Sequence, residues 1–222
     1  MPTSLISATR AESGQTNAGC TRGDGATLDI QVTGAGNVPG NGVSAVILNV
    51  TATRPTAPGF FTVWRQGSTR PTASNLNWKT GQTVPNRVIV PVGSTGKVSV
   101  YNSSGAVDVI VDVSGYFTDA TAAGKLFIPQ VPQQIAETRV TATHGPGGTF
   151  TLAVGGHFGV PSPTTPVIVD VTVTRAPATH PPTAVPAPSL MPPDTSLLLT
   201  PLATVPNLVV LPAGTHAAAP FI

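Results

Sequence analysis

The sequence has little charge and very few lysines and glutamates. Charged residues make up 9% of its 222 residues, where roughly 25% is usual for a soluble domain. Only three lysines and two glutamates are present, and these residues commonly cover exposed helix faces. Glycine (23) and proline (24) together exceed a fifth of the chain. This composition disfavours helices and favours short strands joined by tight turns.

The scarcity of charge also restricts the partners of the chain. The formal net charge is +2, and the arginines and lysines are scattered along the sequence. No cluster of them would neutralise several phosphates, so we do not expect nucleic-acid binding. The sequence also lacks a run of about 18 apolar residues, so no membrane span is predicted.

The amino-terminal stretch and the single cysteine bear on location. The opening "MPTSLISATR" has neither the basic start nor the apolar run of a signal peptide, so a secreted protein would need its signal removed from this sequence. Cys20 has no second cysteine with which to form an internal disulfide. Low charge with many Thr, Ser and Gly is typical of extracellular and virion-surface β proteins, and we expect such a location.

The chain contains an internal repeat. The phrase "VILNVTATR" at 46–54 returns as "VIVDVTVTR" at 167–175, an offset of 121 residues. The same offset carries "VPN" at 84–86 onto "VPN" at 205–207. A register that holds over about 70 residues, with a period above about 100, indicates duplication of a whole domain. We predict a first domain over 1–118, a linker over 119–125, and a second, degenerate domain over 126–222.

Seven segments of the first copy have the pattern of strands. Residues 27–34 alternate between apolar and polar, as half-buried strands do, whereas 43–53 is almost continuously apolar and is predicted to be central. The other five are 60–64, 74–78, 86–92, 97–102 and 107–117. Glycine-containing turns at 93–96 and 102–105 are predicted to close hairpins. We therefore predict an all-β fold of two tandem β-sandwiches, jelly-roll or immunoglobulin-like, with about seven short strands each.

The second copy lacks the last part of the first. Ile222 aligns with Tyr101, so the segment 102–117 has no counterpart in the second copy. Its final strand is therefore missing from the aligned residues. Either the chain was cut at this point, or the second, incomplete domain has an open strand edge, which another chain can fill by adding a strand.

Four phrases of the first copy resemble a repeat common in large secreted and cell-surface proteins of actinobacteria. They are "VILNVTATRPTAPGFFTVW", "RPTASNLNW", "GQTVPNRVIVPVG" and "VDVIVDVSGYF". The resemblance covers about half of the chain and implies an extracellular, non-catalytic β module beside other domains. Members of this group often carry one cysteine near the "TVW" strand and another in the "KVSVYN" strand. In this sequence Gln66 and Ser99 occupy those places.

The sequence offers no constellation for catalysis or metal binding. A hydrolase needs a nucleophile, a base and an orienting group, but the four histidines all lie in the second copy or just before it, and none recurs in the first. The carboxylates of Asp24 and Asp29, and of Asp108 and Asp112, are better explained as exposed strand and loop charges than as Ca²⁺ ligands. We predict no enzyme activity, catalytic residue, cofactor or metal.

Aromatic residues of the first copy are the candidate ligand-binding residues. Phe60 and Trp64 share one face of their strand; the full set is Phe60, Trp64, Trp78 and Tyr101. Exposed aromatic rings stack on sugars, although large aromatics in a sandwich more often belong to the core. A weaker candidate is the integrin-type tripeptide of Arg22, Gly23 and Asp24 in a glycine-rich loop.

Two functions remain open at this point. The first is a structural or assembly module that binds other protein chains, as a homo-oligomer or as part of a larger surface. The alternative is a carbohydrate-binding or adhesion module that uses the aromatic residues of the first copy.

Overall fold

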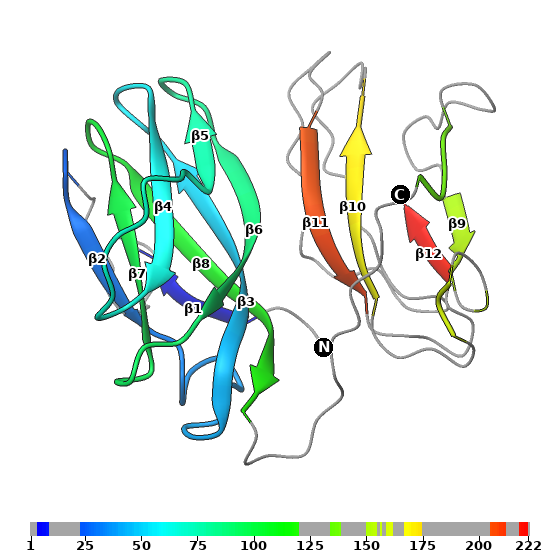
Figure 1. The fold of residues 1–222 in the computed structure, drawn as a ribbon. Coiled ribbons are helices and arrows are strands. Elements are labelled where there is room, and N and C mark those ends of the chain that lie inside the picture. Colours follow the sequence, from blue (N-terminus) through cyan, green and yellow to red (C-terminus); the bar gives the residue numbers. More distant parts are fainter. Residues whose placement is uncertain are drawn as a thin grey trace. The chain divides into compact units, whose positions relative to one another are not determined.

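A computed structural model describes residues 4–8, 23–119, 134–138, 150–154, 156, 159–161, 167–174, 205–211 and 218–221. All regular structure in these residues is β, as predicted, and no helix occurs among them. The chain divides into two compact units, Met1–Gly124 and Lys125–Ile222. Figure 1 shows the strands of both.

The first unit has eight strands in two antiparallel sheets. One sheet, here named the β3 sheet, has the order β1-β8-β3-β6, and the other, the β4 sheet, has the order β2-β7-β4-β5. This is the arrangement of an eight-stranded jelly roll. Of the two predicted sandwich types, jelly-roll and immunoglobulin-like, the first unit therefore has the jelly roll. The strands are β1 (Ser4–Ala8), β2 (Thr27–Gln31), β3 (Val43–Thr53), β4 (Gly59–Arg65), β5 (Leu76–Trp78), β6 (Val84–Pro91), β7 (Lys97–Asn102) and β8 (Asp108–Thr118).

The core of the first unit lies between its two sheets. Leu28 and Ile30 point inward from β2, while their polar neighbours point out. β3 is buried along most of its length, because β6 and β8 flank it in the centre of its sheet. The ring of Phe61, which is fully buried, lies 4.5 Å from that of Trp78 in an edge-on arrangement.

The two glycine-containing turns do not close hairpins, contrary to the prediction. Residues 93–96 do form a tight turn, with the Gly96 amide donating to the Gly93 carbonyl at 2.9 Å. However, this turn joins β6 of one sheet to β7 of the other, and 102–105 likewise joins β7 to β8 across the sandwich. Turn residues specify a chain reversal, but they do not specify which sheet the next strand enters.

The eighth strand, β1, was not predicted from the sequence. It pairs with β8 alone, and its register shifts between Leu5 and Ser7. This irregularity breaks the alternation by which a strand is recognised. Ile6 enters the core from β1, while Leu5 is exposed.

The second unit contains four described strands in two antiparallel pairs. They are β9 (Phe150–Ala153), β10 (Val167–Val173), β11 (Val205–Leu211) and β12 (Ala218–Phe221). In the pair β10–β11, Val167 lies opposite Leu211, as Val46 lies opposite Val90 in the pair β3–β6. β9–β12 reproduces β2–β7 in the same way. Both strand pairs therefore keep the register of the repeat.

Candidate functional site

Strand β3 is paired along both edges in the first unit. β6 pairs with one edge from Ala45 to Ala52, and β8 pairs with the other from Val43 to Thr53. The backbone donors and acceptors of β3 therefore meet partners on both sides, as buried peptide groups must.

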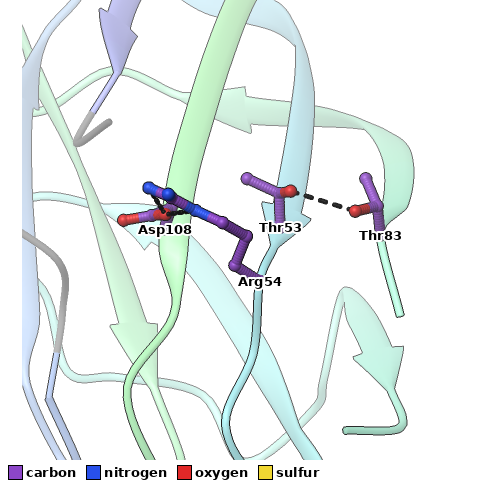
Figure 2. A network of polar contacts seen from close by, with 4 residues as sticks. All are labelled: Thr53, Arg54, Thr83 and Asp108. Atoms are coloured by element: carbon purple, nitrogen blue, oxygen red, sulfur yellow. Dashed lines mark hydrogen bonds and ion pairs between the residues drawn. The ribbon is translucent and has the colours of Figure 1, made fainter. Parts of the chain in front are cut away.

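An arginine and an aspartate fix the start of β8 against the end of β3. Arg54 Nε donates to Asp108 Oδ2 at 2.6 Å, and Nη2 lies 2.5 Å from the same oxygen (Figure 2). The Asp108 side chain is 2% exposed and that of Arg54 is 65% exposed. The backbone of Arg54 is left-handed, with φ of 52°, which costs an L-residue about 1–2 kcal/mol. The contact between Arg54 and the buried carboxylate of Asp108 offsets this strain.

Two threonines form a further polar contact at the same end of the sheet. The hydroxyls of Thr53 on β3 and Thr83, just before β6, lie 2.9 Å apart (Figure 2). Thr53 is also the residue directly opposite Asp108. Polar contacts therefore connect β6, β3 and β8 at this end.

Strand β10 of the second unit repeats β3 but has one strand neighbour among the described residues. β11 pairs with it at the edge that corresponds to the β6 edge of β3. Asp170 and Thr172 are exposed, while the aligned Asn49 is buried and Thr51 is half-buried. On the inward face, Val167, Val169 and Val171 pack against the buried Val209, although each remains half-buried. The edge of β10 that corresponds to the β8 edge is thus the first candidate site.

A second described segment of this unit aligns with β1 of the first unit. "IAETR" at 135–139 aligns with "ISATR" at 6–10, which contains most of β1. Residues 134–138 adopt no strand conformation. In the first unit, the aligned strand β1 pairs with β8 alone.

Three of the predicted aromatic residues lie on the outer face of the β4 sheet. Phe60 and Trp64 project outward from β4 and Tyr101 from β7, and all three are half-buried. The rings of Phe60 and Tyr101 are 6.3 Å apart and tilted by 54°. The guanidinium of Arg70 lies over the Tyr101 ring, 3.6 Å from its centroid, in a cation–π contact. No pattern in the sequence pointed to Arg70, because it lies 31 residues from Tyr101 in an irregular loop.

Trp78 does not belong to this surface, which corrects its place among the candidate ligand-binding residues. Its side chain is 5% exposed and packs against Phe61, and its indole N–H donates to the Ala57 carbonyl at 3.0 Å. Trp78 is therefore a core residue with a satisfied polar group.

The aromatic surface is also interrupted at its middle. Thr62 lies between Phe60 and Trp64 on the same strand face, yet it is almost fully buried. Its hydroxyl donates to the carbonyl of Ala73, in the loop between β4 and β5, at 3.0 Å. The loop covers Thr62 and separates the Phe60–Tyr101 pair from Trp64, so the rings do not form one flat platform.

Gln66 and Ser99, which take the places of the two cysteines implied by the resemblance, both donate hydrogen bonds to Asp29. Ser99 Oγ donates to Asp29 Oδ1 at 2.6 Å, and Gln66 Nε2 donates to Asp29 Oδ2 at 3.5 Å. One carboxylate on β2 thus connects β7 with the residue that follows β4.

The integrin-type tripeptide is only partly described, because Arg22 lies outside the described residues. Gly23 and Asp24 are exposed. The Gly23 carbonyl accepts hydrogen bonds from the Ala26 amide at 3.2 Å and from Asn102 Nδ2 at 2.9 Å. The turn is therefore anchored to the end of β7.

An open groove of about 660 Å³ lies at one end of the first sandwich, between 40–44 and 91–96. Arg65 is the charged residue in its lining.

In the described part of the chain, no three His, Cys, Asp or Glu side chains gather to hold a metal ion, and no helix is long and apolar enough to cross a membrane. The four histidines lie outside the described residues.

No protein family, curated protein or solved structure matches this chain. The resemblance to the actinobacterial repeat therefore stays a prediction, and the jelly roll is identified from strand order alone.

Proposed function

We propose that the chain is a non-enzymatic structural module of an extracellular or virion surface, which binds another protein chain through the open edge of β10. One observation carries this proposal: β10 repeats β3 in sequence and in pairing, but has no described strand in the place of β8. An unpaired edge presents a row of backbone donors and acceptors to any extended segment. Strand addition at such an edge is a common means of assembly.

The proposed location rests on composition and on analogy. Few charged residues and abundant Thr, Ser and Gly suit an extracellular or virion surface, as does the resemblance to cell-surface repeats. Jelly rolls also occur in capsid and lectin domains. Fold analogy does not establish function, so the edge of β10 carries the argument.

The experiment measures mass and strand protection together. Light scattering after size exclusion, over a hundredfold range of concentration, reports self-association. Hydrogen exchange then follows the β10 amides with and without a peptide of residues 102–117. We expect the peptide to protect β10 and to dissociate any oligomers, whereas a control peptide with Val111→Pro, which loses an amide donor, should not. A monomer at every concentration whose β10 gains no protection would overturn the proposal.

Carbohydrate binding is the alternative, and the adjacent rings of Phe60 and Tyr101 favour it. Trp64 and Trp78 are the only tryptophans, and Trp78 lies in the core. A glycan on the outer face of the β4 sheet that extends as far as Trp64 would therefore change the fluorescence of Trp64. A sugar-dependent emission shift that disappears with Trp64→Phe would support this function.

A further inference from the structure

In the first unit, β8 meets β3 with two kinds of contact. On the inward face it supplies a valine at every second position: Val113 opposite Leu48, Val111 opposite Val50 and Val109 opposite Ala52. The aligned inward residues of β10 are all valines. A strand that pairs with the open edge of β10 therefore needs an apolar, β-branched side chain at every second position.

On the outward face, a row of three residues crosses the β3 sheet. Arg87 of β6 lies opposite Asn49 of β3, and Asn49 lies opposite Asp112 of β8. The row therefore carries a positive, a neutral and a negative side chain. The central position, which has both neighbours, holds no charge.

The corresponding row of the second unit has a different distribution of charge. Leu208 takes the place of Arg87, and Asp170 takes the place of Asn49. The negative charge has thus moved to the central strand, and the basic residue on the neighbouring strand is gone. Asp170 is exposed. A strand identical to β8 would place the carboxylate of Asp112 directly opposite that of Asp170, and like charges in that position repel.

From this row we infer that Asp170 selects the partner strand. The partner has the alternating valines of β8 but carries a basic residue in the place of Asp112. This inference rests on the proposed function and goes beyond it, because it names the chemistry of the partner. It also disfavours association through the β8 of a second copy, which carries an aspartate there.

Three peptides of residues 106–118 test the inference: the natural sequence, Asp112→Asn and Asp112→Lys. Each carries an amino-terminal dye, and its binding to the full chain is measured by fluorescence anisotropy at low salt. We expect the affinity to rise from Asp to Asn to Lys, with about a fivefold total gain from removing one repulsion and adding one attraction. The gain should shrink at 1 M salt. It should disappear in the chain variant Asp170→Asn, which leaves the inward face of β10 unchanged.

The outcomes separate the inference from the function on which it rests. If no peptide binds, both the open edge and its selectivity are wrong. If all three bind with equal affinity, or if the Lys peptide still binds more tightly to Asp170→Asn, the open edge stands but Asp170 does not select the partner.

Discussion

The pair β3–β6 of the first unit and the pair β10–β11 of the second are the same two strands in the same register, 121 residues apart. The first pair belongs to a four-stranded sheet, and the second stands alone among the described residues. Leu48 and Val50 are fully buried in β3, whereas the aligned Val169 and Val171 of β10 are half-buried. The two pairs thus share their register but differ in the burial of their inward side chains.

The largest expected effect comes from placing a charge on β8. Val111 is fully buried between the two sheets, and Val111→Asp puts an unpaired carboxylate there, at a cost of about 4 kcal/mol or more. We expect this variant to destabilise the β3 sheet of the first unit. Urea unfolding followed by tryptophan fluorescence reports on the first unit alone, because both tryptophans lie in it.

The matched control is Ile89→Asp on β6 of the same sheet. Ile89 is 44% exposed, so the new carboxylate stays in water and should change stability by only about 0.5 kcal/mol. Equal losses in the two variants would mean that burial by β8 does not explain the difference between the units.

The second prediction compares two arginines that end the same phrase. Arg54→Ala removes the ion pair and hydrogen bond of Arg54 to the buried Asp108 carboxylate and should cost about 2–3 kcal/mol. Arg54→Gly should cost about 1 kcal/mol less, because glycine accepts the left-handed backbone. If the edge of β10 is open as proposed, no carboxylate takes the place of Asp108, and Arg175→Ala should change stability by about 0.5 kcal/mol or less.

Calorimetric unfolding of the three arginine variants measures these differences. An Arg54→Gly variant less stable than Arg54→Ala would contradict the account of backbone strain. A large loss in Arg175→Ala would mean that this arginine has a carboxylate partner that the repeat does not supply.

The sequence predicted the strands better than their arrangement. Alternation in β2 and the apolar run of β3 identified both strands and placed β3 in the centre, because burial leaves a direct pattern in the sequence. The turn at 93–96 was located but misinterpreted, since periodicity tells which face of a strand is buried and not which strand lies beside it. β1 was missed because it is only five residues long and its last three residues, Ile6, Ser7 and Ala8, are all buried, so it shows no alternation.

In the candidate sites, too, local features were predictable from the sequence, whereas contacts between distant residues were not. The outward positions of Phe60 and Trp64 came from strand alternation, which is a local property. Trp78 lay on the core face of a strand only three residues long, too short to show a period. The pairing of Arg54 with Asp108 joins residues 54 positions apart, and no local pattern in the sequence pointed to it.

A third prediction exchanges the central residues of the two rows. Asn49→Asp gives the first unit the carboxylate of the second, opposite Asp112 and 9% exposed. Repulsion and desolvation should cost about 1 kcal/mol, with part of the loss offset by Arg87 on the other side. The loss should be greater at pH 7 than at pH 4, where the new carboxyl is partly protonated. Asp170→Asn should leave the free chain unchanged within about 0.5 kcal/mol, as urea unfolding of both variants at both pH values will show.

The smallest effect concerns a contact that the second copy has lost. Arg70 lies over the ring of Tyr101, while the aligned residues of the second copy are Met191 and Ile222. Because Arg70 is exposed, Arg70→Ala should cost only about 0.5–1 kcal/mol in urea unfolding. Arg70→Lys should retain part of this, because an ammonium also binds an aromatic face, although it lacks the planar guanidinium that stacks on the ring. If Arg70→Ala instead stabilised the first unit, the arginine would be held over Tyr101 at a cost to the fold. The outer face of the β4 sheet would then become the stronger candidate for a binding surface, since exposed strain is retained where a ligand uses it.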